Sequence, residues 1–387
     1  MLKRTLEPVL VKYSNNYPLV SMNGPRQSGK TTLAKMVFPS LPYVSLENLD
    51  TRIHAQSDPR GFLSKYKDGA IFDEIQNTPD IFNYLQEIVD SSQNTGRYVL
   101  TGSQNFVLNS KLTQSLAGRV GMTTLLPLSL QELDSKEDIQ ESIFKGGYPR
   151  LFNTQMHPLD FYPSYVQTYI ERDVRQLRSI DNLGRFQSFL KLCAGRVGSI
   201  LNISSLAQDC GISPTTARSW LEILEASYII FLIHPYHQNF SKRLIKMPKI
   251  YFYDTGLLCS LLGLETPKQI ESHYLKGNLF ENLCVLEVLK SRLNQGLSPN
   301  LYFWRDVSGH EVDLIGEWGG KIHAIEIKWS STFNPDHLKN LKAFKKLASA
   351  KSELPIEQTL IYNGENQGLI GDVDVLNAWS FHSLGAR

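Results

Sequence analysis

The sequence predicts an α/β protein in three consecutive parts: a parallel-sheet domain over residues 1–155, a mostly helical domain over 156–250, and a second α/β domain over 251–387. Three observations support this prediction. The first third alternates short apolar runs with helix-length stretches, the middle repeats aliphatic residues at spacings of three and four, and the last third returns to strand-like runs. A length of 387 residues is also what two or three domains require.

Composition excludes several classes of protein. The chain is 42% hydrophobic and 10% aromatic, which is too apolar for a disordered chain. With 40 Lys and Arg against 38 Asp and Glu, it is neither a uniformly basic nucleic-acid coat nor an acidic protein, although local basic faces fit this balance. Four scattered cysteines without a CxxC pair indicate free thiols rather than a structural zinc site or disulfides. No apolar run is long enough to span a membrane and no apolar signal segment is present, so we expect a soluble cytoplasmic protein without membrane contact.

Five short apolar runs are the expected strands of the first sheet, and helix-length stretches such as 31–37 and 79–90 lie between them. The runs cover residues 18–22, 43–46, 70–72, 98–100 and 123–126.

The sharpest motif is GPRQSGKT at residues 24–31, a complete GxxxxGK[ST] between an apolar strand and a helix. Its glycines let backbone N–H groups turn inward around phosphate oxygens, Lys30 adds a cation for the β- and γ-phosphates, and the Thr31 hydroxyl takes a Mg²⁺ position. We therefore expect a nucleotide-phosphate site formed by Gly24, Pro25, Arg26, Gln27, Ser28, Gly29, Lys30, Thr31 and Thr32.

Acidic and hydroxyl residues end two further predicted strands. Asp73 fits a Mg²⁺ partner, and Glu74 fits the base that polarises a water for attack on the γ-phosphate. Ser103, which follows YVLTG, fits a side chain that senses the γ-phosphate, with a simple turn as the alternative. Arg119 in SLAGRV fits a charge for the transition state in its own chain or a neighbouring one, with an ordinary surface arginine as the alternative.

Taken together, these motifs resemble one family. GPRQSGKTT, IFDEIQ, LTGSQNF, SLAGRV, LPLSLQEL, GGYPR and YIERDV are similar, in this order and over nearly the whole chain, to prokaryotic ATPases that join an AAA-type P-loop domain to a winged helix and a C-terminal nuclease-like domain. The resemblance implies ATP as ligand, with Mg²⁺, and Asp73 and Glu74 as the Walker B pair with Ser103 as a sensor. It also implies Arg172 as an arginine at an interface between domains or subunits, and it allows a homo-oligomer.

Residues 203–220 predict a helix-turn-helix, with Gly211 in the turn, Ser213 as N-cap and Pro214 as the first helical residue. The apolar runs that follow are expected to form a wing that carries Lys242, Arg243, Lys246 and Lys249. In a DNA-binding protein the second helix would present to the groove Thr215, Thr216, Arg218 and Ser219. The wing cations would then supply most phosphate contacts. A connector or protein-contact role is the equal alternative.

The last third carries carboxylates in a strand-like context. Asp313 ends one apolar run, and Glu326 and Lys328 lie two residues apart on the next, so they face the same side. Asp313 and Glu326 can share a Mg²⁺ or Mn²⁺ while Lys328 activates water, which is an arrangement for phosphodiester hydrolysis. Glu281, on the helix-like FENLCVLEVL, could complete the metal shell. The set is similar to the PD-(D/E)xK nuclease core, with Val312 in place of proline, and loss of turnover with retained binding is the alternative.

From these observations we expect an ATPase that acts on or with DNA, in which hydrolysis changes the angle between the first domain and the rest. One alternative is an ATP-dependent nuclease that cuts at Asp313, Glu326 and Lys328. Another is an ATP-switched, non-catalytic module that binds a protein partner. A nucleotide kinase is disfavoured because the sequence shows no acceptor pocket or lid.

Overall fold

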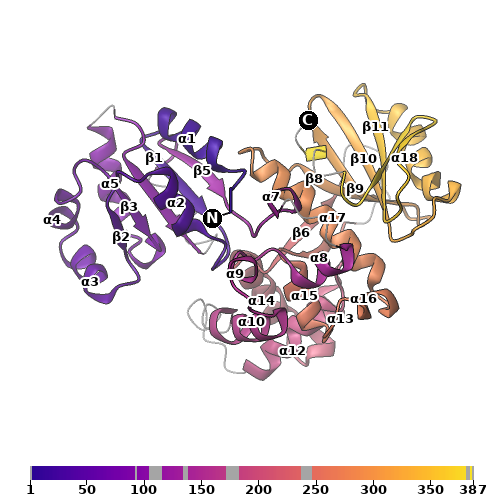
Figure 1. Ribbon diagram of the computed structural model, residues 1–387, viewed down its shortest axis with the longest axis horizontal. Helices are drawn as coiled ribbons and strands as arrows, with labels where there is room; N and C mark the ends of the chain where they lie inside the picture. The colour runs from indigo at the N-terminus through magenta and orange to yellow at the C-terminus, as the bar shows by residue number, and fades with distance from the viewer. Residues whose placement is uncertain are drawn as a thin grey trace.

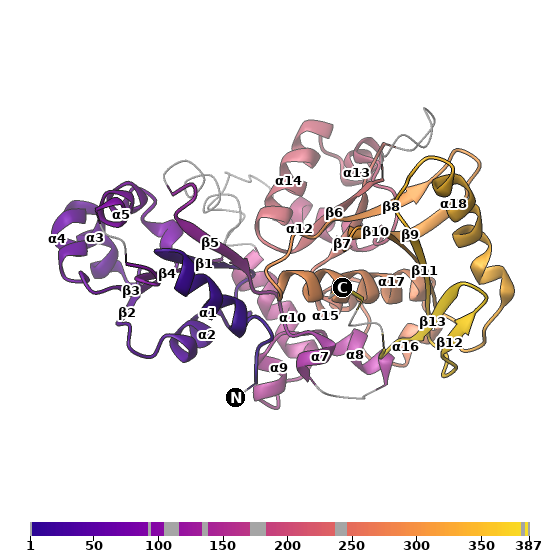
Figure 2. The same ribbon diagram turned by 90° about the horizontal axis from the view of Figure 1, so that it is seen from above.

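The computed structural model describes residues 2–91, 94–103, 116–133, 138–170, 183–236, 246–380 and 384–385. Within these ranges the strands form a five-stranded sheet and an eight-stranded sheet. The two sheets lie at opposite ends of the long axis of the molecule, and helices from the middle of the chain lie between them (Figures 1 and 2).

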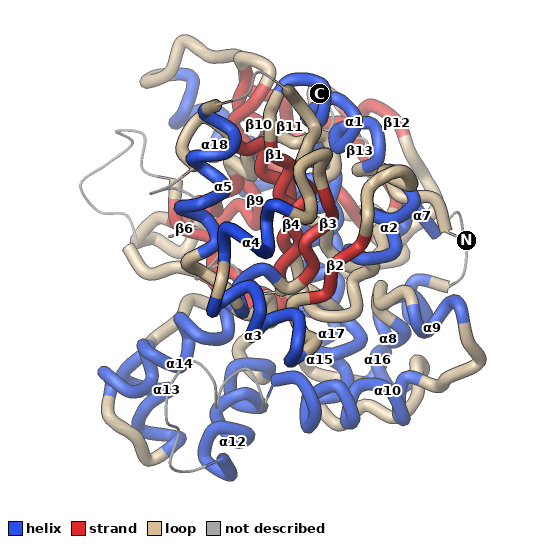
Figure 3. The backbone as a smooth tube through the Cα atoms, turned by 90° about the vertical axis from the view of Figure 1, so that its left-hand side faces the viewer, coloured by secondary structure: helices blue, strands red, loops and turns tan. Residues whose placement is uncertain are grey.

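The N-terminal sheet has the order β2-β3-β4-β1-β5, and all of its neighbouring strands are parallel. Figure 3 shows β2, β3 and β4 side by side in that order. The strands are β1 (Leu19–Asn23), β2 (Tyr43–Ser45), β3 (Ala70–Asp73), β4 (Tyr98–Gly102) and β5 (Val120–Thr124). The helices are α1 (Glu7–Asn16), α2 (Lys30–Val37), α3 (Leu49–Ser57), α4 (Pro59–Ser64) and α5 (Ile81–Asp90), with a 3-10 turn η1 (Ile75–Asn77).

Both faces of this sheet are covered, and this explains why β1, β3 and β4 are buried along their whole length. Leu19 packs in a cluster with residues of α3, α4 and α5, whereas the next residue, Val20, packs with residues of α1 and α2. The predicted parallel α/β domain is therefore confirmed. The fifth strand begins earlier than expected, at Val120, and Leu126 leaves the sheet to pack in the core of the second half of the chain.

The middle of the chain is helical, as predicted. Ser213 caps α14 by accepting a hydrogen bond from the Thr216 N–H, and Gly211 ends α13 in the left-handed conformation. The helices are α7 (Leu130–Leu133), α8 (Ile139–Lys145), α9 (Arg150–Asn153), α10 (Pro158–Tyr165), the π-helical turn η2 (Val166–Ile170), α12 (Leu183–Ala194), α13 (Ile203–Cys210) and α14 (Pro214–Ala226).

The second sheet has the order β12-β13-β11-β10-β9-β8-β6-β7. Its strands are β6 (Ile230–Pro235), β7 (Lys249–Phe252), β8 (Leu301–Arg305), β9 (Glu311–Trp318), β10 (Lys321–Lys328), β11 (Ile356–Tyr362), β12 (Gly368–Ile370) and β13 (Val373–Asn377). The remaining helices are α15 (Thr255–Leu261), α16 (Gln269–Ser272), α17 (Lys276–Leu293), the 3-10 turn η3 (Pro335–Leu338) and α18 (Lys339–Ser349).

The two strands expected to form a wing belong to this sheet. β6 pairs with β7 in antiparallel fashion and with β8 in parallel fashion, so the pair is continuous with the C-terminal strands. One hydrophobic cluster extends from Leu126 to Leu384 and contains residues of both the helical middle and the sheet. The predicted boundary between residues 250 and 251 falls inside β7. Leu126, Ile139, Ile143, Phe144, Tyr148 and Leu151, which were expected in the first domain, pack in the core of the second half. Lys242 and Arg243 lie outside the described residues.

Buried polar contacts hold the segment after β5 against α17. Glu287 on α17 accepts a hydrogen bond from the Leu130 N–H at 2.8 Å, and Lys290 donates to the Leu128 carbonyl at 2.8 Å. The GGYPR segment lies against the same stretch, since the Leu128 N–H donates to the Gly147 carbonyl at 2.7 Å. A Cβ on Gly147 would lie 2.5 Å from the Leu128 carbonyl oxygen, so close packing against Leu128 explains the glycine at this position of the motif. Among the described helices, none combines the length and the hydropathy that crossing a membrane requires.

Candidate functional site

The phosphate loop connects β1 to α2 through a backbone that few residues can adopt. Gly24 has a φ of +148°, and a Cβ at this position would lie 2.1 Å from the Leu125 carbonyl oxygen. Gln27 has a φ of +61° and Gly29, the N-cap of α2, a φ of +96°. The loop therefore ends at a helix N-terminus, where free backbone N–H groups favour an anion.

Lys30 and Thr31 begin α2 and point to different parts of the site. The Lys30 side chain is buried, and its ammonium donates to the carbonyls of Gly24 at 2.9 Å and Pro25 at 2.8 Å. The Thr31 hydroxyl donates to Oδ2 of Asp73 at 2.9 Å. The structure thus brings together the loop and the acidic strand β3, which lie about 40 residues apart in sequence.

Asp73 is surrounded by hydroxyl groups. Besides Thr31, the Tyr43 hydroxyl donates to Oδ2 at 2.7 Å, and the Thr101 hydroxyl donates to Oδ1. Burial and then the hydrogen bond to Asp73 raise the pKa of Tyr43 to about 12. A carboxylate and a hydroxyl are the oxygen donors that Mg²⁺ prefers, so the Thr31–Asp73 pair fits this ion.

Glu74 is held in a strained conformation. Its φ of +56° lies in the left-handed region, which costs a residue with a side chain on the order of 1–3 kcal/mol. The Ser103 hydroxyl donates to its Oε2 at 2.8 Å, and the Gln76 amide donates both to this oxygen and to Ser103. Ser103, expected as a sensor of the γ-phosphate, therefore also fixes the carboxylate of Glu74.

Three residues of this site were not assigned a role from the sequence. Tyr43 begins β2, and its contact with Asp73 arises only because β2 pairs with β3. Thr101 and Gln76 lie within the motifs YVLTGS and IFDEIQ, and this position in a motif was the signal that could have identified them from the sequence. Their contacts depend on the strand order, which the spacing of the motifs does not reveal.

Arg4 ties the phosphate loop to the junction between the two halves. The residue is 5% exposed, and its guanidinium donates to the carbonyls of Ser28 at 2.8 Å and Leu126 at 2.7 Å. Its Nε donates to Oε1 of Glu132 at 3.0 Å. Burial raises the pKa of Glu132, but the Arg4 charge and three further hydrogen bonds outweigh burial and lower it overall.

Arg119 lies at the wrong edge of the sheet to act on the phosphate site of its own chain. It directly precedes Val120, which pairs with Leu19 at the amino end of β1, whereas the phosphate loop follows the carboxyl end. Its guanidinium binds both carboxylate oxygens of Asp90. A role on a neighbouring subunit stays a prediction, and Arg172 lies outside the described residues.

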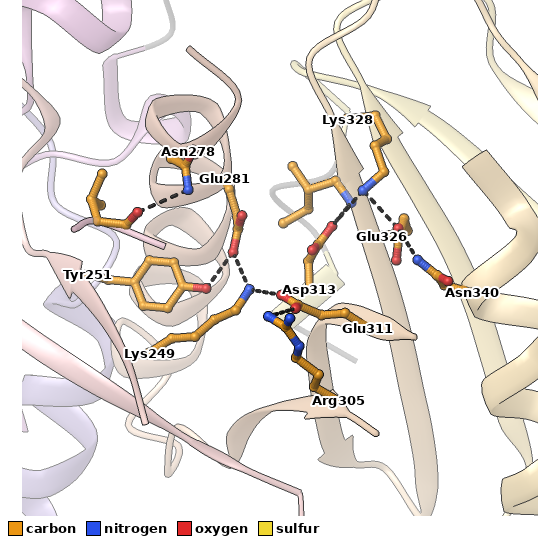
Figure 4. A network of polar contacts seen from close by, with 12 residues as sticks. Lys249, Tyr251, Asn278, Glu281, Arg305, Glu311, Asp313, Glu326, Lys328 and Asn340 are labelled. Carbon is orange, nitrogen blue, oxygen red and sulfur yellow. Dashed lines mark hydrogen bonds and ion pairs between the residues drawn. The ribbon is translucent and has the colours of Figure 1, made fainter. Parts of the chain in front are cut away.

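The second group of predicted site residues meets at the ends of two antiparallel strands (Figure 4). Lys328 at the end of β10 lies 2.8 Å from Oε1 of Glu326 and 3.3 Å from Oδ2 of Asp313. The Ile327 N–H also donates to Oδ2 of Asp313 at 2.8 Å. The three residues are therefore close, as predicted. Asp313 lies near the start of β9, two residues after Glu311, rather than at the end of a strand, because the apolar run after it continues to Trp318.

Glu326 has one oxygen with two donors and one with none. The residue is 1% exposed, and Oε1 accepts from Lys328 and, at 3.2 Å, from Asn340 in the first turn of α18. Within the described ranges no group donates to the buried Oε2. Burial and the neighbouring charge of Asp313 raise the pKa of Glu326 to about 8.

The surroundings of this group differ from those expected at two residues. Oε1 of Glu281 accepts from the Lys249 ammonium at 2.9 Å and from the Tyr251 hydroxyl at 2.6 Å, so a place for Glu281 in a metal shell stays a prediction. Lys249 is not an exposed wing cation: β7 joins the sheet, so the side chain is 2% exposed and also pairs with Glu311. Over the part of the chain that the structure describes, no three His, Cys, Asp or Glu side chains are arranged to hold a metal.

The helix-turn-helix presents part of the expected surface. Thr215 and Arg218 are exposed on α14, and Lys246 is exposed before β7. The Thr216 hydroxyl is hydrogen-bonded to Ser213 at 2.8 Å, so it stabilises the helix start. Ser219 is half-buried.

Comparison with known proteins gives three consecutive family matches: an AAA domain over residues 16–134, a domain of unknown function (DUF8612) over 136–268, and a domain of unknown function (DUF4143) over 276–381. The chain is 31% identical over 366 residues to the uncharacterized proteins Rv2008c of Mycobacterium tuberculosis and Mb2031c of Mycobacterium bovis, covering 92% of this chain and 79% of each relative. It is 23% identical over 269 residues to the uncharacterized protein MJ1544 of Methanocaldococcus jannaschii, covering 63% of this chain and 57% of that protein.

Among solved structures, the Walker-type ATPase of Pyrococcus abyssi is similar over 67% of this chain and 96% of its own, with a TM-score of 0.44 and 16% identity. The matched AAA domain contains the whole phosphate loop together with Tyr43, Asp73, Glu74, Thr101 and Ser103.

Glu132→Gln should reduce the free energy of unfolding at pH 7 by about 2–4 kcal/mol, because it leaves the buried Arg4 without an anionic partner. The folded pKa of Glu132 lies below the ordinary 4.5, so the stabilisation is complete above pH 4.5 and is lost as the pH falls through the folded pKa. Urea unfolding of both proteins from pH 7 downward should show the two curves converging below pH 4.5. A difference that stays constant over the series would contradict this role for the pair.

Proposed function

Because the chain belongs to the family of the mycobacterial protein Rv2008c and carries an AAA-type P-loop ATPase domain, we propose that it hydrolyses ATP at the carboxyl edge of the five-stranded sheet. The observation that carries this proposal is the pair of contacts that join the start of α2 and the carboxyl ends of β3 and β4: Thr31 to Asp73, and Ser103 to Glu74. These contacts support a cation site and a candidate base next to the phosphate loop.

Each residue then has a defined task. Lys30 exchanges its carbonyl partners for the β- and γ-phosphate oxygens, and the N-terminus of α2 binds the remaining phosphate charge. Thr31 and Asp73 would hold Mg²⁺, which neutralises charge on the phosphates. Glu74 accepts the proton of the attacking water, and Ser103 and Gln76 keep its carboxylate in place.

A small cavity beside the loop is lined by residues of both halves of the chain. The cavity has a volume of about 60 Å³ and is lined on one side by Gly29 and Thr32, and on the other by Leu128, Pro149 and Asn153. The second set belongs to the junction that Arg4 and Glu287 tie together. The cavity is too small for a nucleoside, but a loop that moves on nucleotide binding would change the contacts across it and so couple hydrolysis to the angle between the halves.

Glu74→Gln should leave ATP binding intact and lower the hydrolysis rate by roughly 10²–10⁴-fold, because an amide cannot accept the proton of the water. Lys30→Ala should instead weaken binding, because it removes the phosphate-directed cation. Asp68→Asn, an exposed carboxylate in the same domain, is the matched control for Glu74→Gln and should match wild type. Equal ATPase rates for wild type and Glu74→Gln would exclude Glu74 as the base.

The proposal extends to nucleic acid, with support from the capped helix-turn-helix and the exposed Thr215 and Arg218. Duplex DNA should then raise the ATPase rate. Arg218→Ala should weaken DNA binding and reduce the slope of log affinity against log salt by about 0.9 if the lost contact is to a phosphate. Lys12→Ala, an exposed cation on α1, is the control. An unchanged slope in Arg218→Ala would favour the connector role for this segment.

A second candidate function is favoured by the buried Oε2 of Glu326, which accepts no hydrogen bond from the described residues. A divalent cation shared with Asp313 would give this oxygen a partner, and carboxylate oxygens are the donors such ions prefer. With Lys328 positioned against both carboxylates, the group has the parts of a cation-dependent phosphodiesterase.

If the C-terminal group cleaves phosphodiesters, the full chain should nick supercoiled plasmid with Mn²⁺ or Mg²⁺, and EDTA should stop the reaction. Asp313→Asn should abolish nicking and leave the ATPase rate unchanged, since the two sites lie on different sheets. Glu353→Gln, an exposed carboxylate of the same half, is the control. Nicking that persists in Asp313→Asn would assign the activity to another site or to a contaminant.

A further inference from the structure

The Lys249 side chain lies between the carboxylate of Glu281 on α17 and the carboxylates of β9. Figure 4 shows its ammonium between Glu281 and Glu311, on the α17 side of Asp313. The ammonium lies 2.9 Å from Oε1 of Glu281 and also contacts Glu311, while Tyr251 holds the same oxygen of Glu281 at 2.6 Å. Glu281 is thus already bound to a cation that belongs to the protein.

The charges of this network leave one position for a cation from outside. Each lysine contacts two carboxylates: Lys249 binds Glu281 and Glu311, and Lys328 binds Asp313 and Glu326. The carboxylate oxygen of the network that is buried without a donor, over the described ranges, is Oε2 of Glu326. A further cation would therefore find its ligand beside Asp313 and Glu326, and not beside Glu281.

We propose that the C-terminal group binds a single divalent cation between Asp313 and Glu326, and that the ammonium of Lys249 takes the place of a second cation beside Glu281. This inference rests on the second function proposed above. Lys249 is a positioning residue: it comes from β7, it is too deeply buried to touch a substrate, and it keeps Glu281 and Glu311 apart from the ligands of the ion. The arrangement gives the site two positive centres with one exchangeable ion.

The test is Mn²⁺ binding to the nucleotide-free full chain, measured by electron paramagnetic resonance. All proteins carry Asp73→Asn, which removes the carboxylate of the proposed cation site beside the phosphate loop. The reference protein should bind one Mn²⁺ per chain, and Asp313→Asn should weaken that binding at least tenfold. Glu281→Gln keeps acceptors for Lys249 and Tyr251, so it should leave the Mn²⁺ affinity unchanged. A tenfold or greater loss in Glu281→Gln would make Glu281 a ligand and overturn the inference.

A second variant tests the role of the ammonium directly. Lys249→Met leaves Glu281 without its cation, while Glu311 keeps its ion pair with Arg305. The variant should therefore bind two Mn²⁺ per chain and melt at a higher temperature with Mn²⁺ than with EDTA. Adding Glu281→Gln to this variant should return the number to one. Two bound Mn²⁺ per chain in the reference protein would overturn this inference and leave the proposed cleavage standing. No bound Mn²⁺ in the reference protein would overturn both. Circular dichroism of each variant confirms that it is folded.

Discussion

The position of β4 between β1 and β3 is the constraint on which the phosphate site depends. In a parallel sheet, all strands end at the same edge, so the loop after β1, the hydroxyls of β4 and the acids of β3 meet there. Thr101 and Ser103 can bind Asp73 and Glu74 only because no other strand lies between them. The left-handed backbone of Glu74 and the glycines of the loop complete the site at this edge.

A continuous polar path leads from this edge into the second half of the chain. Arg4 binds the carbonyl of Ser28 in the phosphate loop and the carboxylate of Glu132. Leu130, the first residue of α7, binds Glu287 of α17, and Leu128 just before it binds Lys290. The same helix carries Glu281, which is held by Lys249. Because these groups are buried, a shift of one of them must be followed by its partners or cost hydrogen bonds. We propose that a shift of the loop on nucleotide binding reaches α17 by this route.

Local patterns in the sequence were sufficient for the elements and for the motif residues, but not for their partners. The strand–GxxxxGKT–helix pattern predicted the turn from β1 into α2, where Lys30 and Thr31 lie, and the two-residue spacing of Glu326 and Lys328 put them on one face. The prediction that Lys249 is an exposed cation was wrong. A lysine near a basic run is expected to face solvent, whereas pairing of β6 with β8 buries this one. Arg119 and Arg4 show the same limit: which edge of a sheet a residue reaches, and which distant carboxylate it meets, follow from strand order and not from spacing.

The most direct measurement is a crystal structure of the full chain with ADP, aluminium fluoride and Mg²⁺, which together mimic the transferring phosphate. We expect the Mg²⁺ ion to contact the Thr31 hydroxyl and to lie beside Asp73. We also expect the water in line with the aluminium fluoride to donate a hydrogen bond to Glu74. A complex in which the nucleotide occupies the loop but the water is held by another group, with Glu74 turned away, would contradict this account.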